Sequence, residues 1–168
     1  MNRTALLALF LPLFAATAFA ATAFAADPIY IDQLMEMPLG TLQRTFPDLR
    51  KEGCYQLAAD RFLLIQIEKK DQKPGRIVLT STSPCRRPIE SPNVDVRVRN
   101  GIDLGLGPTE IISKAGRPDT AAKPDGELRR FGDLEYFFIC RVSDGCARHT
   151  SIFLKGGVVS AVAEWYSD

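Results

Sequence analysis

The residue types that most directly suggest catalysis surround His149, the only histidine in the chain and therefore the natural general base. A Ser-His-Asp set can be drawn from Ser143 or Ser151 with Asp144. All of these residues fall in one expected hairpin, where neighbouring side chains alternate between faces and do not converge as a triad. No G-x-S-x-G elbow is present. The sequence therefore predicts a protein that is not an enzyme, with a hydrolase using His149 as the less favoured alternative.

Two other patterns resemble catalytic or nucleotide sites only superficially. The run Gly105 to Pro108 looks like a phosphate loop, but it lacks a third glycine, and its proline removes one of the amides that a phosphate needs. Glu135 could pair with Glu127 or Asp133, but nothing in the sequence fixes their separation. We interpret these acids as a charged strand edge, and we expect no catalytic residue and no cofactor.

The four cysteines, Cys54, Cys85, Cys140 and Cys146, can pair in three ways. We favour Cys54–Cys85 with Cys140–Cys146, because the second pair brackets a turn between two strand-like runs. The first pair would close a loop of about 30 residues, worth roughly 3–4 kcal/mol. A zinc site is the alternative, but the chain has no C-x-x-C and a single histidine, so we expect no metal.

Side chains of the types that dominate protein interfaces gather in the last third of the chain. We take these as candidate binding residues: Arg129, Arg130, Tyr136, Arg148, Trp165 and Tyr166. The alternative is that Trp165 packs under a helix and that the arginines are solvated.

The N-terminus has the pattern of a cleaved signal peptide. Arg3 is followed by the apolar run Ala5 to Phe14 and then by Ala-x-Ala exits, of which we favour cleavage after Ala25. The apolar run is short for a transmembrane anchor, and no cysteine lies there to be acylated. We therefore expect residues 1–25 to be removed and the remainder to be a soluble domain in the periplasm or secreted, with no membrane anchor in the mature form.

The charges almost cancel, with 21 basic and 20 acidic residues, and the loss of Arg3 balances them. A nucleic-acid or anionic-membrane binder would need a basic stripe. We expect the local clusters Arg86-Arg87, Arg97/Arg99 and Arg129-Arg130 to be solvated, and we expect no nucleic-acid partner.

The elements that would position these residues form two similar halves, 26–92 and 93–168. The first half has a short helix at Leu39 to Phe46, then strands at Arg61 to Lys69 and Arg76 to Thr82, although a helical start to residues 56–66 stays open. The Pro-rich segment Pro84 to Pro92 is interpreted as an ordered linker, followed by a short strand at Asp95 to Arg99.

The second half begins with a helix, which opens at Gly107-Pro108-Thr109-Glu110 and stops at Gly116 and Pro118. We expect strands at Leu128–Phe131, Leu134–Val142, Ala147–Leu154 and Val158–Tyr166, the last three forming an antiparallel meander covered by helices on one face. The predicted fold class is α+β, with short helices on an antiparallel meander and possible degenerate tandem repeats.

The stretch Gly101 to Pro118, with Gly105-Leu106-Gly107, Glu110-Ile111 and Ala115 to Pro118, resembles a signature of small periplasmic domains. These are the SmpA/OmlA (BamE-like) assembly lipoproteins and the fold-related β-lactamase-inhibitor-protein-like domains. The aromatic strand Tyr136 to Phe138 and the final strand to Trp165 continue the resemblance, and Gly40 to Pro47 looks like a degraded first copy. The BamE-like proteins are lipid-anchored through an N-terminal cysteine, which this chain lacks.

The resemblance implies an exported, non-enzymatic binding domain, either an assembly factor or an inhibitor or immunity-like protein. The expected partner is another envelope or secreted protein, bound through the sheet face. A small-ligand-binding envelope protein is the alternative.

Overall fold

The computed structural model describes residues 27–91, 93–139 and 148–166. Its main feature is a single eight-stranded sheet in the order β5-β2-β3-β4-β10-β9-β8-β7. The strands of this sheet are β2 (Glu52–Ala58), β3 (Arg61–Ile67), β4 (Pro74–Thr80), β5 (Ile89–Glu90), β7 (Thr120–Ala122), β8 (Leu134–Ile139), β9 (Arg148–Lys155) and β10 (Val158–Tyr166). All neighbours are antiparallel except β2 and β5.

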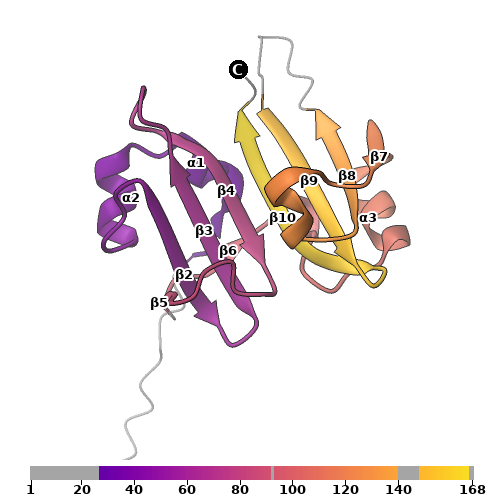
Figure 1. Cartoon of the computed structure of the whole chain (residues 1–168), viewed down its shortest axis with the longest axis horizontal. Helices are drawn as coiled ribbons and strands as arrows, with labels where there is room; N and C mark the ends of the chain where they lie inside the picture. The colour runs from indigo at the N-terminus through magenta and orange to yellow at the C-terminus, as the bar shows by residue number, and fades with distance from the viewer. Residues whose placement is uncertain (1–26, 92, 140–147, 167–168) are drawn as a thin grey trace, which may run out of the picture.

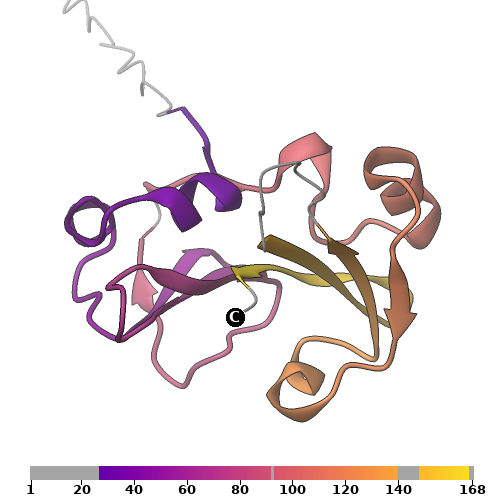
Figure 2. The ribbon, with the colours of Figure 1, turned by 90° about the horizontal axis from the view of Figure 1, so that it is seen from above.

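A small parallel pair, β1 (Ile29–Tyr30) with β6 (Val96–Arg97), lies outside the main sheet. The helices are α1 (Ile31–Glu36), α2 (Leu39–Thr45) and α3 (Pro108–Ala115), with 3₁₀ turns η1 (Arg99–Gly101) and η2 (Gly126–Arg130). Seen from above, α1, α2 and α3 cover one face of the sheet, whereas η2 and the segment that carries β5 lie on the opposite face (Figure 2). We call these the helix face and the open face.

The first half agrees with most of the sequence prediction. The helix expected at Leu39 to Phe46 is α2, and the expected hairpin is β3 and β4. Residues 56–66, for which a helical start stayed open, lie in strands β2 and β3 and in the turn between them. Helix α1 was not predicted, although Ile31, Leu34 and Met35 are spaced as one helical face and are all buried.

The second half confirms α3 and the three-stranded meander. The Gly107 backbone amide donates to Glu110 Oε2 at 2.9 Å, so the glutamate at the third helical position caps the helix start. β8, β9 and β10 are adjacent antiparallel strands, as predicted.

The strand predicted at Leu128–Phe131 is wrong, because this segment is the 3₁₀ turn η2. The backbone amide of Leu128 donates to the carbonyl oxygen of Asp125 at 3.0 Å. The backbone amide of Phe131 donates to the carbonyl oxygen of Leu128 at 2.9 Å. Residues three apart lie on one side of a 3₁₀ turn, so Leu128 and Phe131 both pack onto the open face of the sheet.

The two halves share one sheet because β4 pairs with β10, for example Val78 with Ala163 (Figure 1). With few short helices on a sheet of many strands, the molecule has an α+β architecture. The proposed division at residues 92 and 93 and the tandem repeat stay predictions.

The alternation of side chains along the strands builds a separate core on each face. The larger core lies under the helices and includes Leu63, Ile65, Ile77 and Val162. The smaller one, on the open face, combines Leu64, Val78 and Ala163 with Phe131 and Phe153, whose rings are 5.7 Å apart.

The predicted disulfide Cys54–Cys85 is confirmed, with Cα atoms 6.6 Å apart. It ties the segment between β4 and β5 to strand β2. Cys140 and Cys146 and the expected signal peptide, residues 1–25, lie outside the described residues. Within the described ranges, no helix has the length and apolar character that a membrane span requires.

Candidate functional site

The six predicted binding residues do not form one surface. Tyr136, Arg148 and Tyr166 lie on the helix face, since their strand neighbours Phe138 and Val162 belong to the core under the helices. Trp165 lies on the open face, packed against the smaller core. Arg129 and Arg130 lie on η2, also over the open face. Trp165 and Tyr166 lie on different faces of the sheet because they are adjacent in strand β10, and successive side chains of a strand point to opposite faces.

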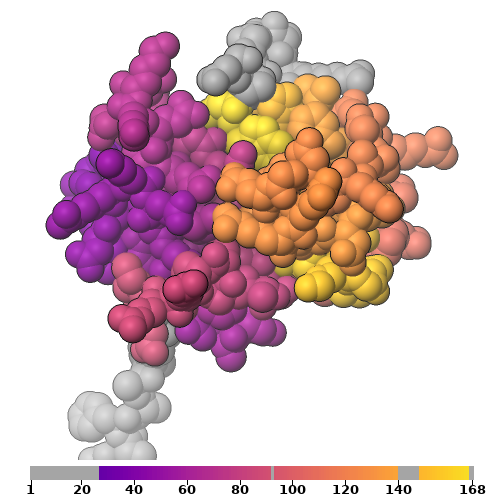
Figure 3. All heavy atoms as spheres, viewed as in Figure 1, coloured from indigo at the N-terminus to yellow at the C-terminus, as the bar shows by residue number. Residues whose placement is uncertain are grey.

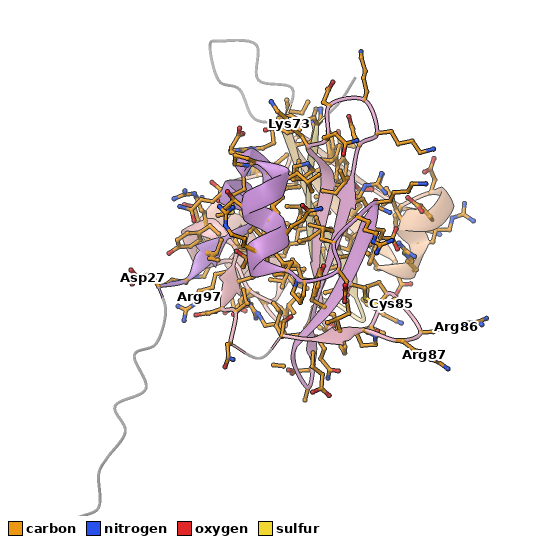
Figure 4. All side chains as sticks on the ribbon, turned by 90° about the vertical axis from the view of Figure 1, so that its left-hand side faces the viewer. Asp27, Lys73, Cys85, Arg86, Arg87 and Arg97 are labelled. Carbon is orange, nitrogen blue, oxygen red and sulfur yellow. A yellow bond between two sulfur atoms is a disulfide. The ribbon has the colours of Figure 1, made fainter. Side chains whose placement is uncertain are left out.

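The arginine pairs singled out in the sequence are dispersed over the surface. Arg129 and Arg130 are exposed, and the Arg130 guanidinium lies 4.8 Å above the ring of Phe131. Arg86 and Arg87 extend outward beside Cys85, far from Arg97 (Figure 4). In space-filling view, the η2 region forms a raised mass over the open face (Figure 3). These basic pairs therefore do not combine into one basic stripe.

An aromatic cluster of Phe137, His149 and Trp165 lies on the open face at the end of β8, β9 and β10. The rings of Phe137 and His149 stack with centroids 4.9 Å apart, and Trp165 lies 6.0 Å from Phe137. Arg76, from β4, places its guanidinium carbon 5.6 Å from the Trp165 ring and pairs with Glu127 at 2.5 Å. All three cluster residues are only partly buried.

The surface around the aromatic cluster combines an exposed apolar side chain with two hollows. Ile139 pairs across the strands with His149 and is 44 % exposed. A cavity of about 320 Å³ lies beside Trp165 and is bordered by Arg76 and Glu127. A second cavity of about 320 Å³ lies beside Phe137. Apolar rings between small hollows are the arrangement in which protein interfaces concentrate their binding energy.

The residues considered for catalysis have other partners. His149 and Ser151 share the open face because they are two positions apart, but Ser151 is fully buried and donates to Glu135 Oε1 at 2.5 Å. His149 Nδ1 is buried and has no hydrogen-bond partner among residues 27–91, 93–139 and 148–166. Glu127 pairs with Arg76 rather than with Glu135. Ser143 and Asp144 lie outside the described residues.

A second candidate site lies on the helix face, in a cavity of about 220 Å³ between α1, η1 and strands β8–β10. Four charged side chains line it, namely Asp32, Arg99, Arg148 and Glu164, together with apolar ones such as Ile31, Val98 and Phe138. Arg99 Nε donates to Asp32 Oδ2. Thr150 Oγ1 donates to Glu164 Oε1 at 2.7 Å.

Glu164 is the most unusual residue of this cavity, since only 6 % of it is exposed. Burial raises the pKa of its carboxyl to about 7, against the opposing effects of the Thr150 hydrogen bond and of Arg148, with Asp32 raising it further. Arg148 Nε is 3.5 Å from Glu164 Oε2, an ion pair without hydrogen-bond geometry. The described residues contain no group of three or more His, Cys, Asp or Glu positioned to hold a metal ion.

The sequence analysis missed Asp32 and Glu164. Glu164 had a usable signal: it is the only acid in the otherwise apolar run Val158–Tyr166, two positions from Val162 and therefore on the same face. The sequence analysis found no comparable signal for Asp32, because helix α1, which carries it, was not predicted.

Comparison of the chain with models of known families, with curated proteins and with solved structures found no significant match.

Proposed function

We propose that the protein is an exported, non-enzymatic binding domain that engages another envelope or secreted protein through the open face of its sheet. The observation that carries the proposal is the partly exposed aromatic cluster of Phe137, His149 and Trp165, flanked by Ile139 and by two cavities. The expected occupant is a loop or extended segment of the partner that carries apolar side chains to fill those hollows.

The chemistry of the cluster supports binding more than catalysis. The Ser151 hydroxyl is buried beneath the sheet surface, so a substrate does not reach it. The His149 ring stacks on Phe137, with the ring centroids 4.9 Å apart. Arg76, held over Trp165 and beside Glu127, adds a charged group that can orient a partner.

Two further observations fit an exported protein. The Cys54–Cys85 disulfide is of the kind that persists in oxidising compartments. The signal-peptide pattern of residues 1–25 gives the same expectation. Periplasmic localisation and the BamE-like or inhibitor-like resemblance remain parts of this proposal.

The test is affinity capture from an envelope extract of the source organism, with matched isoleucine variants. Ile139 and Ile112 are similarly exposed, at 44 % and 41 %, but Ile112 lies on α3 and not on the open face. One stoichiometric partner should be retained by the wild type and by Ile112→Ser, and lost by Ile139→Ser and Trp165→Ala. The proposal would be overturned if the wild type captured no partner. It would also be overturned if the Ile139→Ser and Trp165→Ala variants both retained the partner as the wild type does.

A further inference from the structure

The cavity under α1 contains two buried carboxylate oxygens that receive no hydrogen bond from the part of the chain that the structure describes. These are Asp32 Oδ1 and Glu164 Oε2. Their sister oxygens are already occupied, one by Arg99 and the other by Thr150. A buried acceptor without a donor costs free energy, so native structures rarely leave one unless a bound group supplies the missing hydrogen.

Both orphan acceptors belong to one cavity and come from different elements. Asp32 lies in the first turn of α1, which packs its buried face over β4 and β10. Glu164 lies on β10, and the side-chain alternation of that strand directs it to the helix face. Both residues line the same cavity of about 220 Å³, so we expect a single small group in it to contact both carboxylates.

The remainder of the wall combines apolar and cationic side chains with the neutral polar residues Asn100 and Thr150. Ile31, Val98 and Phe138 give the cavity an apolar side that suits a short hydrocarbon chain. Arg99 pairs with Asp32, and Arg148 lies 3.5 Å from Glu164. The volume of about 220 Å³ is below the usual range for drug-sized ligands, so the occupant is a small molecule.

We propose that this cavity binds a small primary ammonium compound, whose N–H groups donate to Asp32 Oδ1 and Glu164 Oε2. An ammonium group carries three donors and no acceptor, which matches a pair of carboxylate oxygens that accept no hydrogen bond from the described residues. A neutral alcohol offers a single donor and leaves one acceptor unsatisfied. An anion would face both acids. This inference concerns the helix face and does not rest on the proposed partner at the open face.

The experiment compares two cations of equal charge and equal chain length, of which only the first can donate N–H hydrogen bonds. The probes are n-butylammonium and N,N,N-trimethylbutylammonium, added to the full-length protein at pH 8 and followed by ¹H–¹⁵N NMR. Saturable shifts of the Asp32, Thr150 and Glu164 amides are expected with the first probe, with at least tenfold weaker binding of the second. The amides of Asp60 and Glu90, exposed and remote from the cavity, should stay unchanged.

Isosteric variants assign the binding to the two acids. Asp32→Asn and Glu164→Gln should each weaken n-butylammonium binding at least tenfold, because an amide removes the charge and presents a donor to the ligand. Their matched controls, Asp60→Asn and Glu90→Gln, should bind as the wild type does. If a cavity variant does not fold, the comparison of the two cations in the wild type still decides the question.

Two results would overturn the proposal. Equal binding of the trimethyl compound would show that charge alone, and not donation to the orphan oxygens, attracts the ligand. The absence of saturable shifts with n-butylammonium would show that the cavity does not bind a small primary ammonium compound. In both cases the interaction of the open face with a protein partner could still be observed, so the two proposals fail separately.

Discussion

Thr150 donates a 2.7 Å hydrogen bond to Glu164, linking neighbouring strands β9 and β10 beneath helix α1. This bond favours the ionised carboxylate, and so does Arg148, but desolvation outweighs both and raises the pKa of Glu164 to about 7. A carboxyl group on the helix face therefore changes its charge near neutral pH, and the predictions about pH follow from it.

The first prediction concerns the pH dependence of stability. Between pH 4.5 and about 7, the Glu164 carboxyl is protonated in the folded protein but has already lost its proton in the unfolded chain. The contribution of this group is therefore fully present below pH 4.5 and is lost as the pH rises to about 7. The loss is up to about 3 kcal/mol of unfolding free energy, and urea denaturation across this range measures it.

The control for this prediction is Glu164→Gln, which has no proton to release. Its unfolding free energy should depend less on pH across the same window and should exceed that of the wild type at pH 8. A stability profile of Glu164→Gln that runs parallel to the wild type from pH 4.5 to 8 would show that the burial of Glu164 has no such effect.

The second prediction concerns the pH dependence of ammonium binding. Because n-butylammonium needs the ionised Glu164 carboxylate, its affinity should fall as the pH is lowered below about 7, by at most about tenfold per unit. The charged groups around Glu164 are Asp32 and Glu36 on α1, Arg99 on η1, and Arg148 on β9. NMR titrations at pH 6 and pH 8 measure the effect, and affinity that rises on acidification would contradict it.

The third prediction concerns the disulfide. The Cys54–Cys85 bond joins residues 31 positions apart, so its removal should lower the unfolding free energy by about 3–4 kcal/mol. The double variant Cys54→Ala/Cys85→Ala is compared with the wild type by guanidinium denaturation. Arg86→Ala, which changes an exposed neighbour of Cys85, is the control and should leave stability unchanged. A double variant as stable as this control would exclude a stabilising role for the bond.

The fourth prediction contrasts two glycines. A Cβ at Gly132 would lie 2.6 Å from the backbone oxygen of Leu154, so Gly132→Ala should destabilise the protein by about 1–3 kcal/mol. A Cβ at Gly40, within α2, meets nothing within 4 Å. Gly40→Ala should therefore stabilise by about 0.5–1 kcal/mol. Thermal unfolding measures both, and equal effects of the two substitutions would contradict the close approach at Gly132.

Local sequence patterns correctly predicted the helices and strands that are marked by their own residues. Proline and glycine bracket α3 at Pro108 and Gly116, and the alternating apolar run identifies β10. The disulfide Cys54–Cys85 was inferred from the even number of cysteines and an expected chain reversal elsewhere. The prediction of a strand at Leu128–Phe131 was wrong, because two apolar residues three positions apart are compatible with a short strand and with a 3₁₀ turn.

The sequence by itself determined the charge balance, the export signal pattern, the main hairpins and the α+β class, because these depend on composition and on neighbouring residues. The tertiary structure alone decided which side chains meet. Pairing of β4 with β10 joins the halves into one sheet, and the pleat of β10 sends Trp165 to the open face and Glu164 to the helix face. Packing of α1 over that sheet then brings Asp32, near the start of the described chain, into the same cavity as Glu164, near its end. No local pattern encodes that meeting, because it depends on strand pairing between residues far apart in the chain.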